Sequence, residues 1–109
     1  MGAGYKIVIA PFLKVSGMAI FPLILLQHKG LLNDAAIINH ERIHLRQQAE
    51  LLVLPFYIVY LLNYLVNLII YREHNKAYLN IVFEREAYAK EHDLAYLKHR
   101  KWFSWLRYF

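Results

Sequence analysis

The sequence predicts an α+β fold that is mainly α-helical, with an N-terminal β-strand or hairpin followed by three to five helices. The first quarter of the chain is apolar but interrupted by prolines, which disfavours a long helix there. The rest is rich in helix-forming residues and is divided by proline and by polar turns. At 109 residues a single hydrophobic core is usual, so we expect one domain over residues 1–109.

Composition restricts the function. Hydrophobic residues make up 59% of the chain, the formal net charge is +5, and cysteine is absent. Without cysteine, any metal must be held by His, Asp or Glu. A basic, aromatic and apolar chain suits an anionic membrane surface better than nucleic acid, because the cations are scattered and the basic tail is too apolar for a phosphate-binding face. We therefore expect membrane contact and no nucleic-acid partner, and so apolar a chain could also form homo-oligomers.

The N-terminal region is expected to be extended. Pro11 and Pro22 would each remove a helix hydrogen bond, so one long helix is unexpected. The apolar residues of segment 18–27 suit a β-strand that is buried on much of both faces. The alternative is an apolar membrane anchor broken by proline. His28 follows in a turn, where we expect a solvated side chain rather than a metal ligand.

A helix is predicted over residues 35–53. Asn33 or Asp34 can cap it by accepting a hydrogen bond from a free backbone N–H, and good helix formers with helically spaced apolar residues follow. Gln47 and Gln48 lie near the face of this helix that carries His40 and His44. They are either partners for a ligand imidazole or substrate, or two solvent-facing amides.

The motif H-E-x-x-H lies within this helix. His40 and His44 are four residues apart, so both imidazoles project from one face at the spacing that two ligands of one zinc ion need. Glu41 lies beside them and is placed to take a proton from a metal-bound water. The alternative is a pair of helix-surface histidines next to a glutamate. The helical context and a later acidic residue favour metal binding.

A catalytic zinc site usually has three protein ligands, so a third ligand must come from downstream. Glu84 is our choice, on a second helix that could pack across the first. Glu86 is the main rival and His74 a weaker one, and periodicity alone does not separate Glu84 from Glu86. On a helix, Glu84 shares a face with Tyr88 and Glu91 but not with Glu86.

A second helix is predicted over residues 56–71, after a break or kink near Pro55. Segment 51–71 carries no charged residue and is long enough to cross a membrane. Asn63 and Asn67 nevertheless form a polar stripe, and several tyrosines need hydroxyl partners. A spanning helix, a helix lying in the membrane plane and a soluble core helix all remain open.

The last third should hold a polar turn at 72–76, a third helix at 77–92 and a short helix at 94–99 capped by Asp93. The tail, 98–109, is basic and aromatic. It can lie at the level of lipid headgroups or pack its aromatic rings into a small core.

Segment 83–88, F-E-R-E-A-Y, resembles the second motif of the gluzincin metallopeptidases, roughly E-x-x-A-D in their membrane-bound members. The whole pattern also resembles small, uncharacterised bacterial H-E-x-x-H proteins with an F-E-R-E-A-Y motif. The resemblance implies a minimal gluzincin-like core in which Glu84 binds zinc. It also implies a strand beside the active-site helix, for which segment 18–27 is the candidate, whose edge aligns peptide substrate. Tyr88 stands where the membrane peptidases have an acid, and could offer its hydroxyl to a ligand histidine or to the reaction oxyanion.

These features imply a zinc-dependent peptidase. His40, His44 and Glu84 would hold the metal, and Glu41 would activate a zinc-bound water for attack on a peptide bond, with help from Tyr88. The alternative is a catalytically inactive, zinc-stabilised interaction or structural module at a membrane. Small size and the missing acid favour the module, whereas the intact general base favours the enzyme. The basic tail suggests a bacterial inner-membrane location with the site facing the cytoplasm.

Overall fold

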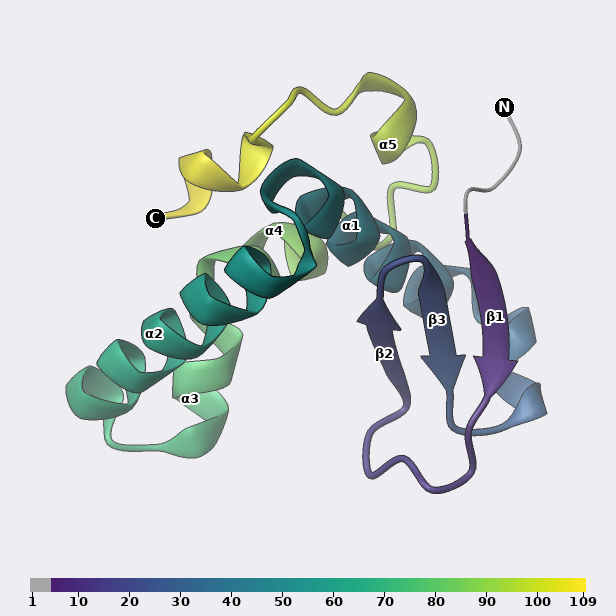
Figure 1. The fold of residues 1–109 in the computed structure, drawn as a ribbon, viewed down its shortest axis with the longest axis horizontal. Helices are drawn as coiled ribbons and strands as arrows, with labels where there is room; N and C mark the ends of the chain where they lie inside the picture. The colour runs from purple at the N-terminus through teal and green to yellow at the C-terminus, as the bar shows by residue number, and fades with distance from the viewer. Residues whose placement is uncertain (1–4) are drawn as a thin grey trace.

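The computed structural model describes residues 5–109 and confirms an α+β fold that is mainly α-helical (Figure 1). Its three strands are β1 (Lys6–Ile9), β2 (Gly17–Ile20) and β3 (Leu23–Leu26). The strand order is β1-β3-β2, with β3 parallel to β1 and antiparallel to β2. β2 is therefore an edge strand.

The single strand expected over 18–27 is wrong, because the chain turns at Phe21-Pro22 and returns as a second strand. Proline has no N–H to give to a ladder, which suits it to the turn rather than to the strand interior. The alternative prediction, an N-terminal hairpin, is confirmed by the antiparallel pair β2 and β3. The backbone N–H of Phe21 donates to Gln48 Oε1, so the turn is tied to the first helix.

Helix α1 (Ala35–Leu51) follows a short 3₁₀ turn, η1 (Lys29–Asn33). Its cap is Asp34, whose Oδ1 accepts a hydrogen bond from the N–H of Ile37 at 3.1 Å. Leu45 packs toward the sheet in a cluster with Ala19, Ile24 and Leu26. Ile43 packs the other way, with Ala87 and Tyr96. The helix is thus held between the sheet and the C-terminal half of the chain.

Helix α2 (Val53–Tyr71) begins three residues earlier than expected. The break lies at Leu52, where φ is 68°, and Pro55 falls inside the first turn of α2. Proline is tolerated there because the first N–H groups of a helix have no intrahelical acceptor. By length and composition α2 could cross a membrane, and little of it is buried.

The turn expected at 72–76 and the single helix expected at 77–92 are both wrong. The chain forms two shorter helices, α3 (His74–Leu79) and α4 (Val82–Lys90). The polar stripe of α2 determines this division. Asn67 Nδ2 donates to the carbonyl of Ala77, and Asn63 Oδ1 accepts from the N–H of Val82, at the start of α4.

The C-terminal segment contains α5 (Tyr96–His99) and a 3₁₀ turn, η2 (Ser104–Tyr108). α5 is shorter than the predicted 94–99, although Asp93 Oδ1 does accept from the N–H of Ala95. Trp105 packs into a core cluster with Phe56, Ile81, Val82 and Phe83. Trp102 and Phe109 are each 71% exposed. Part of the tail therefore completes the core, and part of it lies on the surface.

Candidate metal centre

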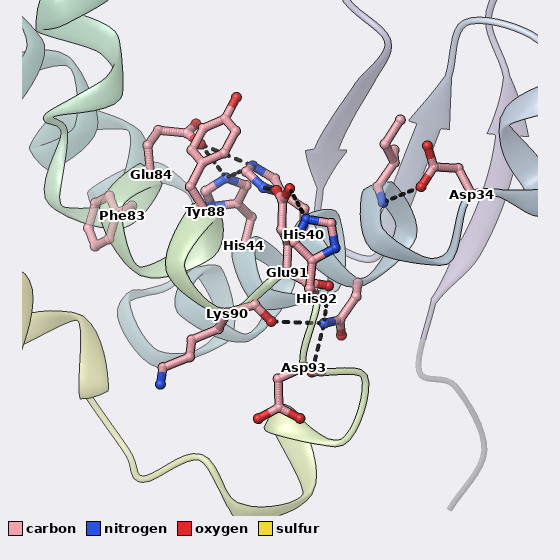
Figure 2. A network of polar contacts seen from close by, with 12 residues as sticks. Asp34, His40, His44, Phe83, Glu84, Tyr88, Lys90, Glu91, His92 and Asp93 are labelled. Carbon is pink, nitrogen blue, oxygen red and sulfur yellow. Dashed lines mark hydrogen bonds and ion pairs between the residues drawn. The ribbon is translucent and has the colours of Figure 1, made fainter.

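Two elements far apart in sequence bring the predicted ligands together. α1 directs His40 and His44 toward α4, which directs Glu84 back at them (Figure 2). Glu84 Oε1 lies 3.1 Å from His40 Nε2 and 3.0 Å from His44 Nε2, and the two Nε2 atoms are 3.2 Å apart. All three side chains are buried. This buried group could hold a metal ion.

The spacing fits a metal ion. With zinc bonds of about 2.0–2.1 Å, tetrahedral ligand atoms lie roughly 3.3 Å from one another. The observed separations of 3.0–3.2 Å need only a small outward adjustment. Two imidazole nitrogens and one carboxylate oxygen are also the donor set of many catalytic zinc sites. Because the same donors suit other divalent metals, zinc itself belongs to the proposal below.

The outer nitrogen of each imidazole also has a partner. His40 Nδ1 lies 2.8 Å from Glu91 Oε1, and His44 Nδ1 lies 2.7 Å from Gln47 Oε1. When an acceptor holds the Nδ1 proton, the lone pair of Nε2 points into the site. Gln47 and Gln48 are both buried, so the solvent-facing alternative is wrong, and Gln47 is the one whose amide oxygen contacts the His44 imidazole.

Glu91 is a contact residue of His40 to which the sequence assigns no role, although helix geometry places it on the face of Glu84 and Tyr88. Asn39, the residue before the motif, donates from Nδ2 to the carbonyls of Lys90, Glu91 and Asp93, at 2.9–3.2 Å. This contact fixes the C-terminal end of α4 against α1 and holds the Glu91 carboxylate at His40.

Glu86, the rival third ligand, points away from the metal group. It accepts hydrogen bonds from Gln47 Nε2 at 2.9 Å and from Arg100 Nε at 2.6 Å, and from the Tyr96 hydroxyl. Arg100 also donates to Glu50 at 2.7 and 3.0 Å, and the side chains of all three ion-pair members are 0% exposed. A continuous network therefore runs from Arg100 through Glu86 and Gln47 to the imidazole of His44.

His74, the weaker rival, is an exposed residue whose Nδ1 lies 2.8 Å from the Tyr64 hydroxyl. It lines the far part of the cleft rather than joining the ligand group. His28 is exposed in the turn before α1, as expected.

The ligands open onto a cleft of about 680 Å³ between β2 and the helices α2, α3 and α4. Glu41 lines this cleft beside the ligands, on the same helix. Gly17 of β2 lies against it, because a Cβ added at Gly17 would fall 3.2 Å from Glu41 Oε2. The edge strand thus approaches Glu41 as closely as a glycine allows.

Burial is the main cause that raises the pKa of Glu41, although His44 and His40 partly oppose it. Burial alone would lower the pKa of His44, but the charge and hydrogen bond of Glu84 outweigh it and raise that pKa to about 9. For Glu84 burial works against ionisation, and the two imidazoles nevertheless lower its pKa. Without a metal ion, the carboxylate of Glu84 and a protonated imidazole at His44 therefore attract each other.

Tyr88 lies at the cleft with its ring against His40, at a centroid distance of 4.5 Å. Its hydroxyl lies 3.0 Å from the Tyr78 hydroxyl, while Glu91 occupies Nδ1 of His40. Tyr60, to which the sequence assigns no role at the site, donates from its hydroxyl to Glu84 Oε2 at 2.6 Å. Its sequence signal is that the tyrosine hydroxyls of segment 51–71 need partners.

The centre therefore combines a three-residue ligand group, a partner for each imidazole and an adjacent carboxylate at an open cleft. Among the contacts that reach the two imidazoles from outside the motif, only that of Gln47 is local in the sequence. No protein-family model, curated protein sequence or solved structure matches this chain.

Proposed function

We propose that this chain is a small zinc-dependent metallopeptidase of gluzincin type. One observation carries the proposal: His40, His44 and Glu84 converge, buried, at the wall of an open cleft that Glu41 also lines. The resemblance of H-E-x-x-H and F-E-R-E-A-Y to the two gluzincin motifs supports it. A purely structural metal site has no need of a free carboxylate beside its ligands.

The residues have distinct roles in peptide hydrolysis. His40, His44 and Glu84 would hold the zinc ion, which when bound would lower the pKa of a water molecule and polarise a carbonyl oxygen. Glu41 accepts the proton of the attacking water and passes it to the leaving amine, and its raised pKa suits both transfers. The Tyr88 hydroxyl, at the mouth of the cleft, donates a hydrogen bond to the oxyanion.

A peptide substrate would align along β2. Ser16 directs its carbonyl at Gln27, beside β3, so the alternate residues Gly17 and Ala19 direct their backbone groups outward. The carbonyl of Ala19 already accepts bonds from Gln48 and Tyr57, whereas Gly17 lies at the cleft. An extended peptide pairing with Gly17 would pass next to Glu41.

The alternative function is a catalytically inactive, zinc-stabilised interaction or structural module. Small size and the missing acid at Tyr88 are the two sequence features that favour it. Glu91, one turn further along, now supplies a carboxylate to His40. A closed structural site would also have a fourth protein ligand rather than a cleft. Both observations favour the enzyme.

We also propose that the protein is associated with the bacterial inner membrane and that its site faces the cytoplasm. The length and apolar composition of α2 support membrane association. The basic C-terminal tail favours the cytoplasmic side, since lysine and arginine accumulate there.

The first experiment measures bound zinc per chain by elemental analysis. We expect about one zinc in the wild type, a loss in His44→Ala and Glu84→Ala, and retention in Glu86→Gln, the matched acid outside the ligand group. A folded wild type that has been offered zinc and binds none would overturn the proposal.

The second experiment compares hydrolysis of a peptide library by zinc-loaded wild type and Glu41→Gln. Loss of the general base should lower kcat by about 10²–10⁴-fold with zinc retained. An unchanged rate would exclude the base role. Zinc binding without hydrolysis of any library peptide would favour the inactive module.

A further inference from the structure

Helix α2 carries its apolar side outward. Eight large apolar residues on one half of its circumference are 43–76% exposed: Leu54, Ile58, Leu61, Leu62, Leu65, Val66, Ile69 and Ile70. The opposite half carries the amides and most of the tyrosine hydroxyls, and is buried or half-buried: Phe56, Tyr57, Tyr60, Asn63, Tyr64 and Asn67. In a soluble protein the apolar side of such a helix faces the core, so here the usual arrangement is inverted.

The polar side is tied to the rest of the protein along the whole helix. Tyr57 donates to the carbonyl of Ala19 at one end, Tyr60 donates to Glu84 near the middle, and Asn67 donates to Ala77 toward the other end. α1, α3 and α4 therefore all cover the same side of α2 (Figure 1). The apolar half is left without a partner among residues 5–109.

We infer that α2 lies in the plane of an anionic membrane leaflet, immersed to about its axis, rather than crossing the bilayer. The inference rests on the membrane association proposed above. A crossing orientation would carry the elements beside α2 into the hydrocarbon, including the metal cleft and the carboxylates of Glu41, Glu84 and Glu91. Charged groups at that depth are costly. An in-plane orientation buries only the apolar half and leaves the cleft in water.

The C-terminal segment indicates a lipid leaflet rather than a second copy of the chain. η2 packs against α4, and its Trp105 and Tyr108 belong to the same core cluster as Val59 of α2. After Asp93 the chain has no acidic residue, and Lys101 and Arg107 are exposed next to four exposed apolar residues: Trp102, Phe103, Leu106 and Phe109. This composition suits the headgroup region of anionic lipids. A second copy would bring the same positive charge, +5 per chain, against it.

The orientation has a consequence for the substrate. Phe56, Tyr57 and Tyr60 line the cleft from the inward side of α2. Because the hydrocarbon boundary runs along the helix axis, the cleft then begins about one helix radius, ~5 Å, from that boundary. The substrate class is therefore a polypeptide segment held at the membrane surface.

The absence of cysteine allows a direct test, because single cysteines can be labelled cleanly. The full chain is labelled with an environment-sensitive fluorophore in four variants: Ile58→Cys, Leu62→Cys, Val66→Cys and Ile69→Cys. Each is bound to vesicles that contain phosphatidylglycerol and nitroxide lipids carrying the quencher at a shallow or a deep position. Asn75→Cys, on exposed α3, is the matched control.

An in-plane helix gives the same depth at all four positions and no lipid quenching at residue 75. A depth that is greatest at Leu62 and falls toward Ile58 and Ile69 would show a crossing helix and overturn the inference, while membrane association would stand. No vesicle binding, with a concentration-dependent dimer in sedimentation, would assign the apolar half to a second copy and overturn it as well.

A substitution gives an independent readout. Leu62→Glu should weaken vesicle binding at least about tenfold, because it places a charge in the immersed half. Asn75→Glu should not, beyond a small electrostatic effect. Bound zinc should be unchanged in both variants, and hydrolysis of soluble peptides without vesicles should be unchanged in Leu62→Glu, which lies outside the cleft that Asn75 lines. Those two measurements report on the metallopeptidase separately, so failure of one proposal is distinguishable from failure of the other.

Discussion

Gly17 tests how closely β2 approaches the general base. In Gly17→Ala the new Cβ would lie 3.2 Å from Glu41 Oε2, closer than ordinary van der Waals contact, so the carboxylate must move. We expect kcat for peptide hydrolysis to fall by about tenfold with bound zinc unchanged, because misplacing a catalytic group by a fraction of an ångström lowers the rate. Gly30→Ala is the matched control, since its Cβ meets only the exposed His28. Equal rates in both variants would contradict this role.

Glu91 tests whether a carboxylate after α4 replaces the acid missing at Tyr88. In Glu91→Gln the hydrogen bond to His40 Nδ1 loses its charged acceptor, and the imidazole becomes a weaker ligand. Zinc affinity should fall by about 10–100-fold in competition with a chelating dye. Glu73→Gln, at an exposed acid outside the site, should leave the affinity unchanged.

Protons should compete with zinc at His44. Because Glu84 raises the pKa of this imidazole to about 9, most chains must release its proton to bind zinc at neutral pH. Zinc affinity should therefore rise about tenfold per pH unit up to about pH 9, with about one proton released per zinc at pH 7. Calorimetry in buffers of different ionisation enthalpy measures that number. An affinity that is constant above pH 7 would mean that the pKa of His44 is not raised.

At the scale of residues, the sequence predicts those site residues that lie close together in the chain. His40, Glu41 and His44 follow from helix periodicity, and Glu84 was preferred over Glu86 only by resemblance, because both spacings are compatible with a helix. The structure separates them because Arg100, fourteen residues further on, holds Glu86. Contacts between distant residues leave no periodic signal in one sequence.

At the scale of elements, Arg100 fixes the C-terminal segment to α1 and α4. In Arg100→Ala the carboxylates of Glu50 and Glu86 would remain buried without their cation. Such a loss lowers the free energy of unfolding by about 3–5 kcal/mol. Urea denaturation of the metal-free protein measures it. Lys101→Ala, at the exposed neighbour, should change it by less than about 0.5 kcal/mol.

The boundaries of the elements are predicted well where local signals set them and poorly where contacts between distant residues set them. α1 ends within two residues of its prediction, because its cap and periodicity are local signals. The division of 77–92 was missed, because Asn63 and Asn67 of α2 determine where α3 and α4 meet. The inverted orientation of α2 was left open for a related reason: its sequence has two distinct faces, but only the packing of α3 and α4 shows which one points inward.

For the whole molecule, removal of the metal separates the two proposed functions. Zinc bound at 1,000 times its Kd stabilises a fold by about 4 kcal/mol, so a chelator should lower the Tm markedly. The core cluster of Phe56, Phe83 and Trp105 and the Arg100 network lie outside the ligand group. These contacts should keep the metal-free chain folded, with its helical circular dichroism retained at 20 °C. A metal that serves catalysis can be removed in this way, whereas a chain whose zinc only ties helices together should lose its fold in the chelator.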